Sequence, residues 1–236
     1  MISIVIPLYN EEENIKYLYQ RLYDASPSWN EDYEILFIDD GSYDDTLLLL
    51  EEICKTNNSV KVIKLSRNFG HQAAISAGIK LAQGNAVVIM DGDLQDPPEE
   101  LYKFLAKWRE GYHVVYAVRI KRKETFFKKI AYKIFYRVLR LISNIDIPLD
   151  SGDFCVMDKK VVRVLNTEMI EHNRFVRGLR AYAGFKQIGV KYERAERAAG
   201  EVKYTFRKLL GLAIDGLLDF STFPLRVASF IGFTIA

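Results

Sequence analysis

The chain has 236 residues, of which 49% are hydrophobic and 27% are charged, so it can bury a substantial core and is neither disordered nor collagen-like. Its formal net charge of +2 is too small to indicate a nucleic-acid-binding protein. The two cysteines, Cys54 and Cys155, lie far apart and outside any Cys-x-x-Cys or histidine-rich context, so neither a disulfide framework nor a zinc site is indicated.

In chain order, short runs of β-branched and apolar residues alternate with stretches of helical periodicity. The strand-like runs are Ile2–Ile6, Glu34–Asp39, Val60–Leu65, Ala86–Asp91 and Val114–Val118. Helix-start signals follow the first, second and fourth runs, at Asn10, Ser42 and Pro97-Pro98. This alternation predicts an α/β domain with a mostly parallel central sheet and helices on both faces.

The loops that follow these strands are the expected place for a ligand. In open α/β sheets, ligands bind outside the carboxyl ends of the strands. Asn10, Asp39, Arg67 and Asp91 fall there. The chain contains neither a GxGxxG nor a GxxxxGK[ST] pattern, so a nucleotide site at this edge would be of another kind.

The most specific local pattern is the acidic segment 91–98, which directly follows the apolar run Ala86–Met90. Asp91 and Asp93 are two residues apart at a strand end, where their carboxylates can converge on a hard divalent cation that bridges diphosphate oxygens. The alternative is a loop of helix-capping aspartates ahead of Pro97. Without a cation, the acids of this short segment would repel one another.

A second acidic pair, Asp39-Asp40, closes the second strand-like run, and the segment 6–11 closes the first. The carboxylates and amides of these two loops can hydrogen-bond a base and a ribose. Alternatively, Asp40 and Ser42 are ordinary turn and helix N-cap residues.

Between residues 121 and 142 the sequence is rich in lysine and arginine, and Glu124 is the single acid. At a helical period, apolar side chains gather on one side and cations gather beside them, which predicts a basic amphipathic helix over about 121–142. This composition is typical of helices at an anionic lipid surface, and the alternative is a solvated surface helix. We also predict an interfacial amphipathic helix over 205–222 and the start of a transmembrane segment over 223–236.

Six segments along the chain share their order with those of a known enzyme family. They are Ile6-Pro7-Leu8-Tyr9-Asn10-Glu11-Glu12, Asp39-Asp40-Gly41-Ser42, Ser66-Arg67-Asn68-Phe69-Gly70-His71-Gln72, Asp91-Gly92-Asp93-Leu94-Gln95-Asp96-Pro97-Pro98-Glu99, Ser151-Gly152-Asp153-Phe154 and Arg197-Ala198-Ala199-Gly200-Glu201-Val202-Lys203-Tyr204. Together they resemble the family 2 glycosyltransferases of the GT-A fold. Within that family they are most similar to the polyprenyl-phosphate branch, which includes dolichol-phosphate mannose synthase and bacterial polyprenyl-phosphate glucosyltransferases. The resemblance implies a GT-A catalytic domain over residues 1–204.

The resemblance also implies roles for particular residues. It places the nucleotide against Pro7, Asn10, Glu11 and Asp39. It places Mg²⁺ or Mn²⁺ on Asp91, Asp93 and Gln95. Cations for the lipid phosphate and the nucleotide phosphates are implied at Arg119, Lys133, Arg137, Arg197 and Lys203. The segments around His71 and Asp153 are more similar to the glucosyl and aminoarabinosyl members than to the mannosyl ones, which favours a UDP-sugar, with glucose as the first expectation. We interpret His71 as a hydrogen-bonded structural residue rather than a catalytic base.

These features predict a metal-dependent enzyme that moves a hexose from a nucleotide-sugar to polyprenyl phosphate with inversion. A phosphomonoester has a second pKa near ~6, so its oxyanion is nucleophilic without a general base. Asp153 is a catalytic candidate that would orient the sugar or the acceptor, and the alternative is a role as base.

Two other functions fit parts of the sequence. One is a family 2 transferase that acts on a hydroxyl acceptor of a polysaccharide or soluble glycan, with Asp153 as base. The other is a non-catalytic domain that binds nucleotide-sugars or organises a membrane. We expect the catalytic domain on the cytosolic side of the inner or plasma membrane of a bacterium, with no nucleic-acid partner and with copies able to associate through the C-terminal helices.

Overall fold

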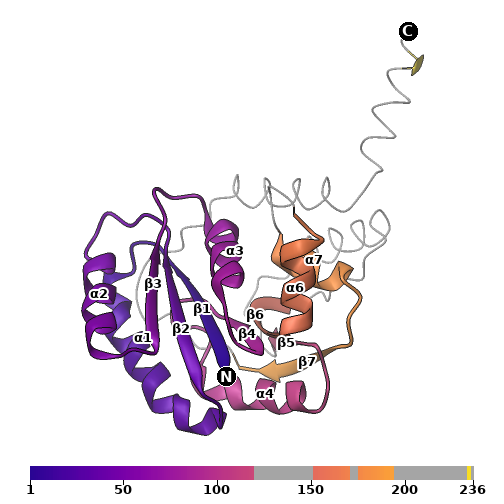
Figure 1. Cartoon of the computed structure of the whole chain (residues 1–236), viewed down its shortest axis with the longest axis horizontal. Helices are drawn as coiled ribbons and strands as arrows, with labels where there is room; N and C mark the ends of the chain where they lie inside the picture. The colour runs from indigo at the N-terminus through magenta and orange to yellow at the C-terminus, as the bar shows by residue number, and fades with distance from the viewer. Residues whose placement is uncertain (120–150, 171–174, 194–232, 235–236) are drawn as a thin grey trace, which may run out of the picture. The chain divides into compact units, whose positions relative to one another are not determined.

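The computed structural model of the chain describes residues 1–119, 151–170, 175–193 and 233–234 (Figure 1). The chain divides into two units, and all described residues except 233–234 belong to the first, which comprises 1–121 and 150–200. The helices predicted over 121–142 and 205–222 lie outside the described residues, as does nearly all of 223–236. Those expectations, and the domain boundary at 204, remain predictions.

Seven strands and six helices make up the described part of the first unit. The strands are β1 (Ile2–Leu8), β2 (Tyr33–Asp39), β3 (Val60–Lys64), β4 (Ala86–Ile89), β5 (Val114–Arg119), β6 (Ser151–Asp158) and β7 (Gln187–Tyr192). The helices are α1 (Glu12–Ala25), α2 (Thr46–Thr56), α3 (His71–Leu81), α4 (Leu101–Arg109), α6 (Lys159–Thr167) and α7 (Val176–Tyr182), with short 3₁₀ helices η1 (Ser26–Trp29) and η2 (Pro98–Glu100). The five strands predicted from the sequence are confirmed, and β6 and β7 are additional.

All seven strands form one sheet in the order β3-β2-β1-β4-β6-β5-β7. The pairs β1–β2, β1–β4, β2–β3 and β5–β7 are parallel, which confirms the mostly parallel sheet. Strand β6 is the exception, because it runs antiparallel to both β4 and β5. Its amino end therefore lies at the same edge of the sheet as the carboxyl ends of the other strands.

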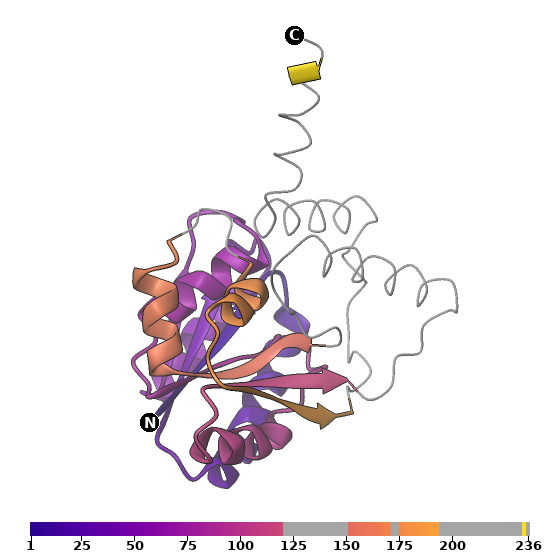
Figure 2. The same ribbon diagram turned by 90° about the vertical axis from the view of Figure 1, so that its right-hand side faces the viewer.

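Helices cover both faces of this sheet, as predicted (Figures 1 and 2). Alternate residues of β1 point to opposite faces, and Ile2, Ile4 and Ile6 are fully buried in the cluster that includes Ile15 and Leu18 of α1. On the other face, α3 approaches the sheet closely at Gly78. A Cβ atom there would lie 2.2 Å from a methyl carbon of Val5, so only glycine allows this packing.

A buried carboxylate joins three of the parallel strands near their amino ends. Glu34, only 4% exposed, accepts hydrogen bonds from Ser3 Oγ, from Lys61 Nζ at 2.7 Å and from the Gln83 backbone N–H at 2.8 Å. Ser3 Oγ in turn accepts from the Gly84 N–H at 2.7 Å. The network satisfies the polar groups that this end of the sheet buries.

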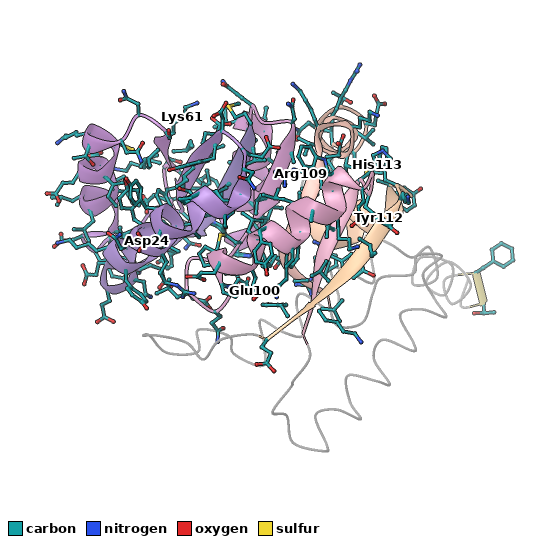
Figure 3. The ribbon with its side chains drawn as sticks, turned by 90° about the horizontal axis from the view of Figure 1, so that it is seen from below. Asp24, Lys61, Glu100, Arg109, Tyr112 and His113 are labelled. Carbon is teal, nitrogen blue, oxygen red and sulfur yellow. The ribbon has the colours of Figure 1, made fainter. Side chains whose placement is uncertain are left out.

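Helix α4 is fixed to the rest of the body at its carboxyl end. Arg109 donates from Nη2 to the backbone carbonyl of Trp29 at 2.6 Å and also contacts Glu31. Figure 3 labels Glu100, which directly precedes this helix, and Arg109, its last residue. Among the helices that the structure describes, none has both the length and the apolar character needed to cross a membrane.

Candidate active site

The loops after β1 and β2 are joined to each other at the carboxyl edge of the sheet. The Asn10 backbone N–H donates to Ser42 Oγ at 3.0 Å, and the Tyr43 N–H donates to Asn10 Oδ1 at 3.1 Å. Asn10 adopts a left-handed backbone with φ of 52°, which asparagine tolerates better than most residues. The alternative that Ser42 caps a helix is wrong, because α2 begins at Thr46 and Ser42 instead holds the Asn10 loop.

Glu11 and Pro7, two other residues of the predicted nucleotide site, have structural partners. The Glu11 N–H donates to Thr46 Oγ1 at 2.8 Å, and its Oε2 accepts from Asn14 Nδ2 at 2.7 Å. Pro7 is buried within β1. These contacts hold the loop in place. The nucleotide contacts predicted for Pro7 and Glu11 remain predictions.

Two adjacent aspartates at the end of β2 have different environments. Asp39 is fully buried, and its Oδ1 accepts from the Ser42 N–H at 3.2 Å. Its Oδ2 is buried and has no hydrogen-bond partner among the described residues. Asp40 uses both oxygens, because Oδ1 accepts from the Phe69 N–H at 2.8 Å and Oδ2 from the Gly70 N–H at 2.9 Å. Of these two aspartates, Asp39 is therefore the one that offers a buried oxygen to a ligand, since a buried acceptor without a donor is costly.

The Asp40 carboxylate fixes the loop that leads into α3. Gly70, at φ of 98°, precedes the helix and accepts from the Ala73 and Ala74 N–H groups. The loop also packs tightly on Gly41, where a Cβ atom would lie 2.5 Å from the Arg67 carbonyl carbon. As a result, α3 begins at a fixed point, and its first residue is His71.

His71 lies between two of the predicted catalytic carboxylates. Its Nε2 is 3.5 Å from Asp91 Oδ1 and 3.6 Å from Asp153 Oδ2. Asp91 follows β4, whereas Asp153 is near the amino end of β6, so the antiparallel direction of β6 brings them to one edge. Arg177 of α7 reaches the same Asp153 oxygen at 3.2 Å. The four side chains come from four different elements.

Charge and burial act together on this cluster. Burial disfavours the charged form of His71, but its hydrogen bond to Asp153 and the charge of Asp91 outweigh that effect and raise the pKa of His71 to about 9. Burial and neighbouring carboxylates raise the pKa of Asp91 to about 7, against the opposing effect of His71. Burial also acts on Asp153, but Arg177 and His71 hold the pKa of that carboxyl well below its usual range.

The acidic turn after β4 is held by contacts from several elements. Asp93 Oδ1 accepts from the Gln95 N–H at 3.2 Å, and Asp96, 1% exposed, accepts from Tyr192 Oη at 2.6 Å. Between them, Leu94 has φ of 64°, a conformation that costs a leucine roughly 1–2 kcal/mol. The surrounding bonds maintain this strained turn.

The predicted metal residues have suitable chemistry for Mg²⁺ or Mn²⁺. Two carboxylates and a carboxamide are hard oxygen ligands, and a divalent cation would offset the carboxylate repulsion that adds to the effect of burial in raising the pKa of Asp91. Within the described ranges, no three histidine, cysteine or acidic side chains form a group that could hold a metal ion. The set Asp91, Asp93 and Gln95 thus remains a prediction whose remaining ligands would come from diphosphate and water.

Several residues of this edge were absent from the predicted site. Gln72 Oε1 accepts from the Val176 N–H at 3.0 Å and so joins α3 to α7. Arg180, 2% exposed, donates to the Gly152 carbonyl at 2.9 Å. The sequence carries no local signal for Arg177 or Arg180, because both lie in a helix far along the chain from β4.

Other predicted site residues lie partly or wholly outside the described structure. The backbone of Arg119 ends β5, but the placement of its side chain is not described. Lys133, Arg137, Arg197 and Lys203 lie outside the described residues. Their predicted phosphate contacts remain predictions.

Comparison with known proteins gives consistent matches over the chain. The family described as glycosyl transferase family 2 matches residues 3–165. An uncharacterized glycosyltransferase of Bacillus subtilis is 52% identical over 98% of this chain and 71% of its own length. A prophage bactoprenol glucosyl transferase homolog of Escherichia coli is 37% identical over 100% of this chain and 76% of its own.

Solved structures share the fold at low sequence identity. Glucosyl-3-phosphoglycerate synthase from Mycobacterium tuberculosis, in complex with Mn²⁺, UDP and its product, has a TM-score of 0.59 and 18% identity, covering 93% of this chain and 79% of that one. A mannosyltransferase from Pyrobaculum calidifontis, in complex with GDP-mannose and Mn²⁺, has a TM-score of 0.58 and 18% identity, covering 85% of this chain and 57% of that one.

Proposed function

This chain belongs to glycosyl transferase family 2 and has the GT-A fold, and on that premise we propose that it transfers glucose from UDP-glucose to a polyprenyl phosphate with inversion. The observation that carries the proposal is the similarity to a prophage bactoprenol glucosyl transferase homolog of Escherichia coli and to the bactoprenol glucosyl transferase of Shigella phage SfV, each 37% identical across all of this chain. Bactoprenol is a polyprenol, and the six sequence segments quoted above point to the same acceptor class.

The donor would bind at the carboxyl ends of β1 and β2. The free, buried Oδ2 of Asp39 is suited to accept the N3–H of a uracil, and the joined loops around Asn10 form a rigid wall for the nucleoside. An acceptor atom held in a buried position discriminates between bases because a mismatched ligand leaves it unpaired.

The diphosphate would lie against the acidic turn after β4. A divalent cation, Mg²⁺ or Mn²⁺, would neutralise the charge that develops on the departing diphosphate. Asp91, Asp93 and Gln95 would hold it, and the hydrogen bonds of Asp93 and Asp96 described above keep their turn in one conformation. Binding to a preformed turn avoids the entropy of ordering it during the reaction.

The acceptor would attack directly as a phosphate oxyanion. Asp153 is poorly suited to remove a proton, because Arg177 at 3.2 Å and His71 keep its pKa low and its carboxylate weakly basic. A lipid phosphate needs no such base, since it is ionised near neutral pH. In this reaction Asp153 would orient the sugar or the acceptor.

The lipid acceptor also accounts for the predicted basic segment 121–142. Cations beside an apolar helix face favour an anionic membrane surface, by roughly 1 kcal/mol each. We therefore propose that the catalytic domain is attached to the cytosolic face of the membrane, where it meets both substrates.

A panel assay tests the proposal. The full chain is incubated with Mg²⁺ or Mn²⁺, a short-chain polyprenyl phosphate and each of UDP-glucose, UDP-galactose and GDP-mannose, and the lipid product is separated by chromatography. Transfer from UDP-glucose is expected to be fastest. Transfer only to a hydroxyl acceptor, such as a soluble glycan, would contradict the proposed acceptor.

A further inference from the structure

We infer that Arg177 of α7 is an acceptor-phosphate residue, with its guanidinium beside Asp153 receiving the phosphate of the polyprenyl acceptor. The inference rests on the proposed function and adds to it a residue that neither the sequence patterns nor the family resemblance singled out. It follows from where fixed charges lie across the site and from a comparison of the two arginines of α7.

Fixed charges divide the site into two sides. On the side of the β4 turn, the charges of Asp96 and Asp93 act on Asp91, as does that of Asp153, and this acidic environment suits a cation and a diphosphate bound through it. On the side of β6 and α7, Asp153 faces two arginines in the described part of the chain, since Arg177 contacts it and Arg180 contacts the preceding residue. Arginines stay protonated at all relevant pH, so these three described side chains together carry a net positive charge.

A doubly charged phosphate must approach the donor diphosphate to react, and the repulsion between them opposes that approach. Among the described residues of the site, the side of β6 and α7 is where a fixed positive charge can offset the repulsion. Through Asp153 and His71, Arg177 is linked to Asp91, the first predicted metal ligand, with successive separations of 3.2, 3.6 and 3.5 Å. A phosphate bound to Arg177 would therefore be connected to the predicted metal ligand through two intervening side chains.

The two arginines of α7 are not equivalent. Arg180 is 2% exposed and donates to the Gly152 carbonyl, which is a structural contact. The Arg177 side chain is 23% exposed. Guanidinium groups can bind a carboxylate on one edge and a phosphate on another, because they carry five donors in a planar fork.

The position of Arg177 is fixed by its neighbour in the chain. The backbone N–H of Val176 is held by Gln72, the second residue of α3, at 3.0 Å. Since His71 and Gln72 are adjacent, the same start of α3 that places His71 between Asp91 and Asp153 also sets where α7 begins. The guanidinium is thus presented from a defined backbone position.

The test compares neutral variants of Arg177 with a matched control. Arg177→Gln removes the charge, Arg177→Met removes it while keeping aliphatic length, and Arg177→Lys keeps it without the fork. Arg163→Gln makes the same charge change on an exposed residue of α6 in the same unit. For each full-length variant, the KM for a short-chain polyprenyl phosphate, the affinity for UDP by calorimetry and the Tm are measured.

We expect Arg177→Gln and Arg177→Met to raise the acceptor KM by about tenfold or more, with UDP affinity within twofold of wild type. Arg177→Lys should recover part of the loss, and Arg163→Gln should match wild type. An unchanged acceptor KM in a folded neutral variant, or an equal loss of UDP affinity, would overturn the inference. If Arg177→Gln does not fold, the acceptor KM of Arg177→Met decides the question.

The wild-type protein separates this inference from the proposed function. If it glucosylates no polyprenyl phosphate, the proposed function is overturned as well. If wild-type transfer is normal and the neutral variants are unaffected, this inference alone is overturned.

Discussion

Replacing Asp40 by alanine should destabilise the domain through the loop that leads into α3. In the native structure both Asp40 oxygens accept backbone N–H groups, from Phe69 at 2.8 Å and Gly70 at 2.9 Å. A hydrogen bond to a charged group contributes roughly 1.5–3 kcal/mol, so the pair would contribute at most about 6 kcal/mol. Phe69 is 48% exposed, so water can reach the released N–H groups. We therefore expect the free energy of unfolding to fall by about 3 kcal/mol.

An asparagine at position 40 separates the two bonds. It keeps one oxygen acceptor, but its NH₂ group faces a backbone donor and the charge is lost, so we expect a loss of about 2 kcal/mol. Asp24 provides the matched control, because it is exposed and contacts Gln20 on the same helix. Asp24→Asn should change stability by less than about 0.5 kcal/mol.

Unfolding by denaturant, followed by tryptophan fluorescence, measures these differences in stability as shifts of the denaturant midpoint while the dependence of the unfolding free energy on denaturant stays constant. The expected order of stability is wild type and Asp24→Asn, then Asp40→Asn, then Asp40→Ala. If Asp40→Ala unfolds at the same midpoint as Asp24→Asn, the carboxylate does not hold the loop. Loss of transfer with unchanged stability would instead mean that Asp40 contacts a substrate.

Three further outcomes are expected from the same structure. Asp91→Ala, Asp93→Ala or excess chelator should each abolish transfer, because diphosphate without a cation is a poor leaving group; full turnover under any of these conditions would remove the metal assignment. Asp39→Ala should raise the KM for UDP-glucose more than it lowers kcat, and calorimetry showing unchanged UDP affinity would argue against the base contact. Glu34→Gln should destabilise the protein near neutral pH but much less in acid. The pKa of Glu34 is lowered, with burial opposed by Lys61, Ser3 and Gln83, so its stabilisation is present above the ordinary glutamate pKa of ~4.3 and is lost as pH falls through the lower folded value. A difference between Glu34→Gln and wild type that is independent of pH in unfolding experiments would contradict this.

The strands that could be predicted are those with continuous apolar sequences. Strands β1, β2 and β4 are buried on both faces, and such strands read as unbroken apolar runs. Strand β6 begins with the polar segment 151–153, and β7 contains Gly189, where a Cβ atom would lie 2.7 Å from a methyl carbon of Val118. Their place in the sheet depends on the pairing of β6 with β4 and β5 and of β7 with β5, and local composition does not encode those pairings.

The same distinction applies to the site. Asp39 and Asp91 were identifiable because each ends an apolar strand, where position alone gives a chemical role. Asp40 is identical in type to Asp39 and adjacent to it, and only the course of the 66–70 loop assigns its oxygens to backbone N–H groups. The sequence could suggest a hydrogen bond for His71 but could not name its partner Asp153, because that residue is brought near by β6, which the sequence did not predict.

The reversed direction of β6 also has a consequence for how this enzyme can vary. Strand β5 ends at Arg119 and β6 starts at Ser151, and Val118 pairs with Ser151, so the chain leaves the sheet and returns to it at the active-site edge. The 31 residues 120–150 lie between these two strands, so we predict that exchanging them leaves unchanged every strand pairing that the structure describes. Chimeras that carry this segment from another relative should therefore fold on the same sheet.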